Sequence, residues 1–149
     1  MSISYVLDTT IVIQGVLEEE NTWRVQTLFY RAVQPDDLLL HIPEFTLIEC
    51  GNVLWKQVRF RGETAENAQV MLHNLRVFPL QTYASTSLLP RALEIALSST
   101  LAVYDCIHIA LAETLRCPLI TVDQRQANAA EAVGVNLKTI TDFPEYQED

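Results

Sequence analysis

The segment SYVLDTT, residues 4–10, contains the pattern that decides the fold: three apolar residues in succession that run directly into an aspartate. Because Tyr5, Val6 and Leu7 are all apolar, both faces of their strand are expected to be buried, as in parallel sheets covered on two sides. Similar segments recur along the chain. Further strands are expected at 38–42, where Pro43 stops the strand, at 77–80, where the signal is weak, at 119–122, and at 135–138, at an edge of the sheet.

Longer amphipathic segments separate these strands and are expected to form helices. Gly62 and Gly134 have the position of glycines that end helices. Strands joined by helices predict an α/β fold with a central, mainly parallel sheet of four to five strands, covered on both sides. Ligands of such sheets bind beyond the carboxyl ends of the strands, so a polar residue directly after a strand is a site candidate. The helices are expected at 22–33, 44–60, 63–76, 87–99, 104–116 and 125–133.

The composition limits the domain organisation and the class of partner. The 149 residues fit one ordinary domain, which we expect to span 1–149, with the acidic tail 145–149 fraying at its end. Ten Lys and Arg against 19 Asp and Glu give a net charge of -9. This balance disfavours a diffuse electrostatic grip on nucleic acid or on anionic membranes.

The N-terminal segment and the cysteines indicate the compartment. Residues 1–17 lack a basic start, and Asp8 interrupts their apolar run, so they predict neither a secretory signal nor a membrane span. Cys50, Cys106 and Cys117 lie in apolar contexts without any C-x-x-C spacing, and we expect three reduced core residues. These features favour a cytoplasmic protein with no membrane association.

Two aspartates follow predicted strands directly. Asp8 ends SYVLD and Asp123 ends LITVD, so both are expected at the same rim of the sheet. A single aspartate in this position is explained more simply as the N-cap of the following helix. Two of them converging on one crevice favour a functional site.

Glu49 and Asp105 are the other acidic candidates. Glu49 lies on a largely apolar helical stripe, where an unpaired carboxylate would be neutralised or would destabilise the fold. Either a basic residue meets it, with Lys56 as the simplest choice, or a cation does. Asp105 precedes a strongly apolar helix, and N-capping alone would explain it, but burial of that helix draws the residue inward.

Four carboxylates at one crevice would repel one another strongly unless cations were present. Hard divalent ions with oxygen ligands relieve this repulsion, and Mg²⁺ or Mn²⁺ with a few carboxylates and a substrate phosphate fits best. The residues themselves therefore predict metal-dependent phosphoryl chemistry and leave the phosphate ester open.

Four short motifs carry a resemblance to a known family. They are a strand ending in Asp8-Thr9, Pro43-Glu44 followed by Glu49-x-x-Asn52, the run from Tyr104 to Ala112, and Thr121-x-Asp123 after a strand. In this order and spacing, over nearly the whole chain, they resemble the PIN domain, the nuclease module of VapC-type toxins of prokaryotic toxin–antitoxin pairs. Thr10, where many relatives carry Asn or Ser, and Gln126, near a position that is apolar in relatives, depart from the family pattern.

The resemblance implies a PIN-like three-layer α/β/α sandwich and a metal-dependent endoribonuclease that leaves a 5′-phosphate and a 3′-hydroxyl. It places one or two Mg²⁺ or Mn²⁺ ions on Asp8, Glu49, Asp105 and Asp123, with Asp8 and Asp105 as direct ligands. Thr9 and Thr121 are expected to serve the ion's waters or the phosphate, and Asn52 to orient Glu49. Local turn or helix hydrogen bonds explain these three residues equally well.

The RNA substrate is expected on the basic segment that follows Glu49. Lys56, Arg59 and Arg61 are the candidate contacts, and Phe60 between the two arginines offers a stacking surface for single-stranded RNA. A solvated basic helix face is an equally good interpretation. A cognate antitoxin could dock on the same helices, and the apolar helix faces also permit a homodimer.

Other chemistries are weaker on this sequence. His108 is more simply a core histidine than a general base, and neither His41 nor His73 belongs to a zinc pattern. A PIN-like scaffold that binds RNA or protein without catalysis is one alternative function. A haloacid-dehalogenase-like phosphatase is another, although its chemistry requires Asp-x-Asp after the first strand, where this chain has Asp8-Thr9-Thr10.

Overall fold

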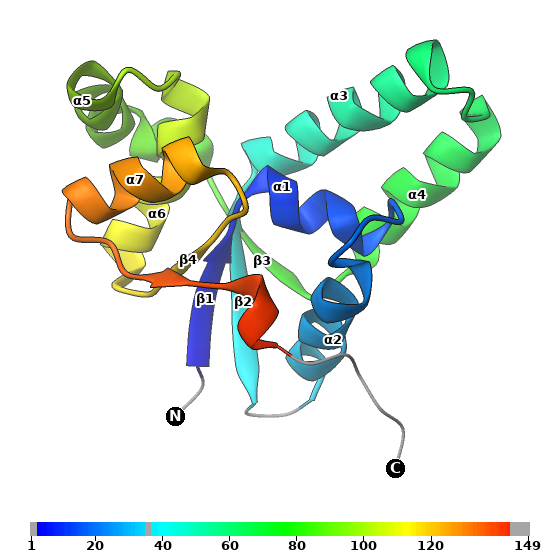
Figure 1. Cartoon of the computed structure of the whole chain (residues 1–149), viewed down its shortest axis with the longest axis horizontal. Helices are drawn as coiled ribbons and strands as arrows, with labels where there is room; N and C mark the ends of the chain where they lie inside the picture. Colours follow the sequence, from blue (N-terminus) through cyan, green and yellow to red (C-terminus); the bar gives the residue numbers. More distant parts are fainter. Residues whose placement is uncertain (1–2, 35–36, 144–149) are drawn as a thin grey trace.

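A parallel sheet with the first strand at its centre organises the fold. The structure is a computed structural model, and it describes residues 3–34 and 37–143. Within these residues, five strands pair in parallel in the order β3-β2-β1-β4-β5 (Figure 1). They are β1 (Ile3–Leu7), β2 (Leu38–Pro43), β3 (Leu80–Tyr83), β4 (Leu119–Ile120) and β5 (Leu137–Lys138). The predicted parallel sheet is confirmed.

Helices cover both faces of this sheet. One group comprises α1 (Thr9–Val12), the 3-10 turn η1 (Ile13–Gly15), α2 (Thr22–Ala32), α3 (Phe45–Phe60), α4 (Ala65–Val77) and the turn η3 (Ile140–Asp142). The other comprises η2 (Ser85–Leu88), α5 (Leu89–Ser99), α6 (Val103–Leu115) and α7 (Gln124–Ala132). Side chains alternate along β1, so Tyr5 and Leu7 pack with the first group and Val6 with the second. This arrangement confirms the predicted three-layer sandwich.

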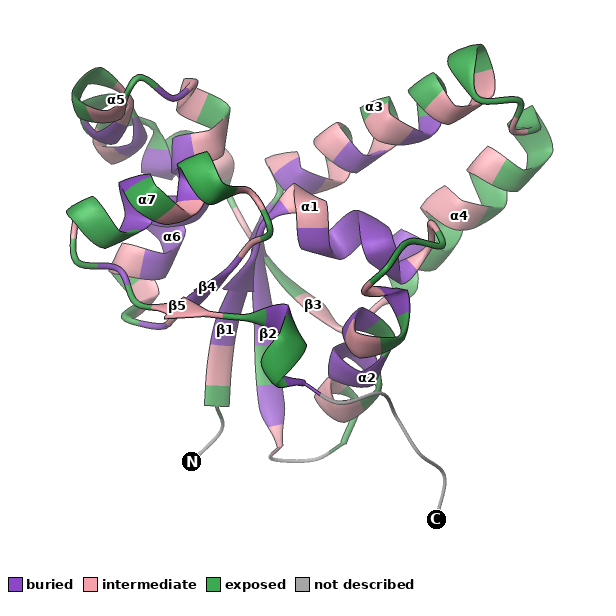
Figure 2. Ribbon diagram, viewed as in Figure 1, coloured by how far each residue is buried: buried purple, intermediate pink, exposed green. Residues whose placement is uncertain are grey.

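The most deeply buried elements are the middle strands and the helices beside them. Figure 2 shows burial concentrated in β1, β2, β4, α1 and α6, whereas the outer ends of α3 and α4 are largely exposed. These two helices form an antiparallel hairpin that projects from the body of the molecule (Figure 1). The hairpin is thus a protruding arm that begins at the carboxyl edge of the sheet.

The expected position of the third strand was wrong, and that of the second was right to within one residue. The third strand, expected at 77–80, occupies Leu80–Tyr83, because α4 continues to Val77 and Pro79 favours an extended Phe78 that ends the helix. The second strand, expected at 38–42, ends at Pro43 as expected, although Pro43 itself still belongs to β2 and pairs with Tyr83.

The segment after β1 and the ends of β4 and β5 also differ from expectation. The residues Thr9–Gly15 were not predicted as helical, because a run rich in β-branched residues has low helix propensity; the Asp8 cap and tertiary burial override it. β4 and β5 are two residues each instead of four, and the chain leaves the ladder at Thr121. The six helices predicted from the sequence are confirmed to within two residues at each end.

Three further expectations can be compared with the structure. Gly62 and Gly134 have φ of 78° and 84° after helix ends, a conformation that favours glycine, and the predicted helix punctuation is confirmed. The three cysteines are buried free thiols, as predicted. The tail 145–149 lies outside the described residues.

No single helix in the described ranges is long and apolar enough to cross a membrane. Only Ser85–Ser99 taken together with Val103–Leu115, which are bent by 116° relative to each other, meet the length and composition criteria.

Candidate active site

The order of the strands brings the predicted acidic residues to one edge of the sheet. Asp8 follows β1, and Asp123 follows β4 by a short segment, while β1 pairs with both β4 and β2. Glu49 lies in α3, directly after β2, and Asp105 lies in the first turn of α6. Along the carboxyl edge the sequence of elements is therefore β2 with Glu49, β1 with Asp8, and β4 with Asp123.

Asp8 is the most buried of the four, with 1% of its surface exposed. Its Oδ1 accepts hydrogen bonds from the Thr10 hydroxyl at 2.6 Å and the Ile11 amide at 3.2 Å, and its Oδ2 accepts one from the Thr121 hydroxyl at 2.5 Å. The pKa of Asp8 is raised to about 6, because burial, with a smaller contribution from the charge of Asp123, outweighs the three hydrogen bonds that lower it. Asp8 is therefore a fixed carboxylate that is poorly compensated for its loss of water.

Glu49 is held by a hydroxyl from α1. The Thr9 Oγ1 donates to Glu49 Oε1 at 2.7 Å. Burial raises the pKa of Glu49, the Thr9 hydrogen bond lowers it, and the charge of Asp105 raises it. Among the described residues Lys56 forms no ion pair with Glu49, so the basic partner considered from the sequence is not present.

His108 lies behind Glu49 as a neutral core residue. It is 2% exposed, its Nε2 lies 2.8 Å from the Thr46 hydroxyl and 3.8 Å from Glu49 Oε1, and burial lowers its pKa to about 4. Its Nδ1 has no hydrogen-bond partner in the described part of the chain. A neutral imidazole gives Glu49 no positive charge, which agrees with the core histidine predicted from the sequence.

Asp105 and Asp123 complete the cluster from α6 and α7. The Asp105 carboxylate accepts no hydrogen bond from the described residues; burial and the charge of Asp123 raise its pKa, and the charge of Arg125 lowers it. Asp123 Oδ1 caps α7 through the amides of Arg125 at 2.9 Å and Gln126 at 3.3 Å. The capping role considered for Asp8 and Asp123 is thus real, and it coexists with their convergence.

The chemistry of these donors fits a divalent cation. Asp8, Glu49 and Asp105 are carboxylates whose pKa values are raised by burial, and no Lys or Arg of the described residues forms an ion pair with any of them. As the side chains stand, no three acidic, histidine or cysteine residues in ranges 3–34 and 37–143 are grouped closely enough to hold a metal. The oxygen donors match the ligand preference of Mg²⁺ or Mn²⁺.

A recess of about 530 Å³ opens beside Glu49. Its walls come from α1, one side of α3 and the start of α6, and include the predicted residues Asn52 and Lys56. The rings of Phe45 and Tyr104 line it with their centroids 6.3 Å apart. The recess therefore combines a carboxylate, a cation and an exposed aromatic surface.

The other predicted residues take different positions. Asn52 lines the recess, but the hydrogen bond to Glu49 comes from Thr9. The hydroxyls of Thr9 and Thr121 both donate to carboxylates in this structure. Arg59 and Arg61 lie at the far end of α3, more than two helical turns beyond Glu49, where Arg59 stacks over Phe60 at 5.5 Å.

Sequence reasoning missed three residues that hold the cluster. Thr10, noted only as a departure from the family pattern, donates to Asp8. Gln126 is 3% exposed, and its Nε2 donates to the Asp105 carbonyl at 2.8 Å, so it ties α7 to α6. Thr46 positions the imidazole of His108. Gln126 and Thr46 are polar residues that lie within about one helical turn of a predicted ligand, and this spacing is the sequence signal that would have found them.

Comparisons with known proteins agree with this architecture. The family model for the PIN domain matches residues 5–132. Ribonuclease VapC3 from Pyrobaculum aerophilum is 29% identical over 131 residues, which are 86% of this chain and 95% of the relative. The solved structure of PAE2754 from the same organism has a TM-score of 0.71 at 19% identity, and the match covers 95% of this chain and 94% of that one.

A second structural neighbour is VapBC2 from Rickettsia felis, solved with a DNA fragment from its promoter. It has a TM-score of 0.63 at 15% identity, with 92% of this chain and 98% of that chain covered. The two structural neighbours share the fold, and the family model spans most of the sequence, strands β1 and β4 and their aspartates included. The chain therefore belongs to the PIN domain family.

Proposed function

We propose that the chain is a metal-dependent endoribonuclease that hydrolyses RNA phosphodiester bonds and acts as the toxin of a toxin–antitoxin pair. The observation that carries the proposal is the set of buried and half-buried carboxylates without a Lys or Arg ion pair, which lie at the carboxyl edge of a PIN-family sheet. The relative VapC3, itself named a ribonuclease, supports the reaction class.

Asp8, Glu49, Asp105 and Asp123 are the residues proposed to hold Mg²⁺ or Mn²⁺. A bound ion at such a site supplies Lewis acidity that activates water and offsets the charge developing on a phosphate. The protein's own part is positioning. Thr10 and Thr121 fix the two oxygens of Asp8, and Thr9 fixes one oxygen of Glu49.

The recess beside Glu49 is proposed to bind the RNA strand. Lys56 is the cation within it, and the faces of Phe45 and Tyr104 offer a surface on which a base can stack. Arg59 and Arg61 are proposed to contact more distant phosphates, because they lie on the projecting arm and not in the recess. Contacts of this kind are local, which suits a chain with a net charge of -9.

A cognate antitoxin is proposed to dock on the arm formed by α3 and α4. An apolar groove of about 240 Å³ runs between these helices, and Trp55 beside it is 55% exposed. The VapBC2 neighbour supports a partner of this class. A basic side chain from that partner would meet the unneutralised carboxylates at the foot of α3. We also propose that the chain forms a homodimer and acts in the cytoplasm.

Isosteric variants of the acidic residues test the proposed reaction. Asp8→Asn, Glu49→Gln, Asp105→Asn and Asp123→Asn remove one charge each, and Asn retains the capping ability of Asp. Glu131→Gln, which changes an exposed acid on α7, is the matched control for net charge. Labelled single-stranded RNA is incubated with each protein and MnCl₂ or EDTA, and the 5′ and 3′ ends of the products are identified.

The expected result is cleavage that needs the metal and persists in the control. In the four variants the cleavage rate should fall at least about a hundredfold. The separation of the acidic side chains within the described ranges favours one alternative, a PIN-like module that binds RNA or protein without catalysis. Calorimetry separates the two, since that module would take up no Mn²⁺ at millimolar concentration.

A further inference from the structure

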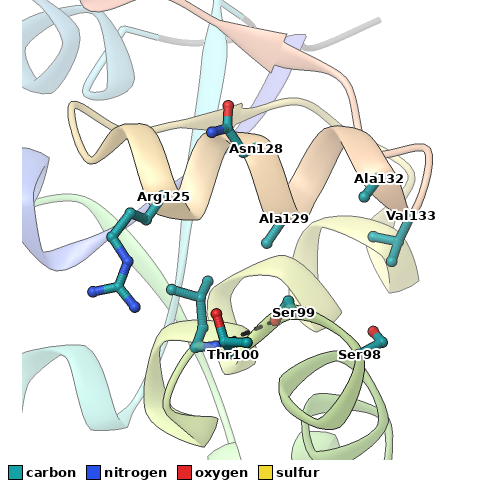
Figure 3. A pocket seen from close by; sticks show the side chains of 9 residues that line it. Ser98, Ser99, Thr100, Arg125, Asn128, Ala129, Ala132 and Val133 are labelled. Atoms are coloured by element: carbon teal, nitrogen blue, oxygen red, sulfur yellow. Dashed lines mark hydrogen bonds between the residues drawn. The ribbon is translucent and has the colours of Figure 1, made fainter.

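A second recess lies among the helices of the second group, α5, α6 and α7. It has a volume of about 330 Å³ and lies between α7 and the turn from α5 to α6. Its walls are Arg125, Asn128, Ala129, Ala132 and Val133 from α7 and its end, and Ser98, Ser99, Thr100 and Leu101 from the turn (Figure 3). The turn precedes α6, whose first turn holds Asp105, and α7 begins directly after Asp123. The walls of the recess are therefore next to these two acids in the sequence, although neither acid lines it.

Arg125 is the charged side chain of this recess, and no carboxylate of the described residues forms an ion pair with it. Four of the ten Lys and Arg are engaged with carboxylates or carbonyls, namely Arg24, Arg31, Arg91 and Lys138. Arg125 forms no ion pair or side-chain hydrogen bond with any described residue. It nevertheless lies close enough to Asp105 to lower that carboxyl's pKa. Arg125 is thus a free guanidinium next to the proposed catalytic centre.

The recess has polar groups beside an apolar floor formed by residues such as Leu101 and Ala129. Figure 3 shows the Arg125 guanidinium extending from α7 into the space above the turn, whereas the Asn128 amide points away from that space. Asn128 Oδ1 accepts from Gln124 Nε2 at 2.8 Å, which holds the amide in that position. The hydroxyl of Thr100 makes no hydrogen bond with the described residues and is available to a ligand in the recess.

The backbone at Thr100 is a second distinctive feature of this wall. Its φ is 66°, a left-handed conformation that is unusual for a β-branched residue and that glycine would adopt without strain. A threonine at this position, unlike glycine, places a hydroxyl at the mouth of the recess.

We propose that this recess binds a backbone phosphate of the RNA on the far side of the scissile bond, with Arg125 as its phosphate-binding residue and Thr100 as a hydrogen-bond donor. The proposal rests on the proposed ribonuclease function. Lys56 marks the β2 end of the acidic cluster and Arg125 the β4 end, so a strand that spans the cluster meets one unpaired cation on each side. On a chain with a net charge of -9, two such cations define the path of a polyanion.

The test separates RNA binding from cleavage. A fluorescein-labelled single-stranded RNA of mixed sequence, about ten nucleotides long to span one such site, is titrated with the full chain in EDTA at several KCl concentrations. Arg125→Ala should weaken binding about tenfold and reduce the slope of log affinity against log salt by about one, and Arg125→Lys should restore the slope. Arg76→Ala, which removes a likewise exposed cation from α4, is the control and should leave affinity within about twofold.

Two further measurements exclude a purely structural role. Thr100→Gly should weaken RNA binding without lowering the melting temperature, because it relieves the left-handed strain. With MnCl₂, Arg125→Ala should raise KM and leave kcat nearly unchanged. If Arg125 only neutralised Asp105, the variant would bind Mn²⁺ more tightly by calorimetry while the salt slope for RNA stayed at its wild-type value, and that result overturns the proposal.

The outcomes also distinguish this proposal from the proposed function. Wild-type cleavage with an unchanged KM in Arg125→Ala rejects the recess and leaves the ribonuclease in place. Arg125-dependent RNA binding without cleavage by the wild type supports the recess and rejects the ribonuclease. If an octaglutamate peptide binds more tightly than the RNA in an Arg125-dependent manner, the recess serves an acidic protein segment and the proposal fails.

Discussion

The replacement Asp8→Asn should make the metal-free protein more stable at neutral pH, and the gain should disappear in acid. Asp8 is buried, and its pKa is raised from 3.8 to about 6 in the folded chain. A group with a raised pKa binds its proton more tightly in the folded state than in the unfolded state. The folded state is therefore favoured by protonation, and wild-type stability falls as pH rises from about 4 to about 6.

The size of the effect follows from the two pKa values. The difference between 3.8 and about 6 corresponds to about 3 kcal/mol in the free energy of unfolding, which is present in full below pH 3.8 and lost above pH 6. The asparagine of the variant carries no charge at any pH, so the variant's stability lacks this dependence. Asparagine also rearranges the hydrogen bonds with Thr10, Thr121 and Ile11. This rearrangement should change the variant's free energy of unfolding by about 1 kcal/mol at every pH.

Urea unfolding in EDTA at about pH 4.5, 5.5, 6.5 and 7.5 measures the effect as a difference between variant and wild type. Glu49 and Asp105 also have raised pKa values, so they make the stability of both proteins fall with rising pH. Their contributions cancel when the wild-type free energy of unfolding is subtracted from that of the variant. The difference should increase by about 2 to 3 kcal/mol in favour of Asp8→Asn across this range. Glu131→Gln, at an exposed position, should give a flat difference.

A difference that stays flat, or that decreases with pH, would refute the reasoning. A flat difference would mean that Asp8 titrates near its unfolded pKa because its three hydrogen bonds compensate its desolvation in full, and a decreasing one would mean that they lower its pKa below that value.

Four other substitutions give independent checks. His108→Gln should show the opposite pH slope, because burial lowers the pKa of His108 from 6.5 to about 4 and wild-type stability then rises with pH in this window, as urea unfolding in EDTA will measure. Thr9→Val removes the donor to Glu49, so calorimetry should show Mn²⁺ affinity reduced about tenfold, with an unfolding free energy within about 1 kcal/mol of wild type. Gly15→Ala places a Cβ 2.2 Å from the Phe29 ring and should destabilise by about 2 kcal/mol, whereas Gly51→Ala in α3 meets nothing within 4 Å and should stabilise by about 0.5 kcal/mol in thermal unfolding.

The parts of the fold and site that the sequence predicted are those controlled by local pattern. The apolar segments that precede Asp8 and Asp123 are defined by neighbouring residues alone, and parallel pairing of β1 with β4 then brings both aspartates to one edge. The same logic failed at 77–80, since the third strand has polar residues on an exposed edge and its start depends on where α4 ends. Local pattern also missed α1, which is stabilised by tertiary burial of Ile11 and Val12.

The hydrogen bonds within the site depend on residues far apart in the chain and have no local signal. Thr121 reaches Asp8 across 113 positions, and Thr9 reaches Glu49 across 40. Sequence reasoning placed Arg59 and Arg61 near the RNA because they follow Glu49, although one helix carries them away from the cluster. No local pattern identifies Arg125, because its proximity to Asp105 comes from the packing of α7 against α6.

A divalent ion should reverse the stability order that Asp8→Asn creates, and this reversal distinguishes a metal site from a pair of helix caps. In EDTA near pH 7.5 the variant is expected to be more stable, because the wild type keeps a buried charge without a counterion. An ion that binds only the folded state adds about 2.7 kcal/mol at a concentration roughly one hundred times its Kd, which is close to the roughly 3 kcal/mol lost by ionising Asp8. Wild type in MnCl₂ should therefore reach or exceed the stability of Asp8→Asn, whose weakened site gains little. If MnCl₂ shifts both proteins equally, Asp8 acts as a cap and a core acid, and the PIN-like module without catalysis becomes the better account of this chain.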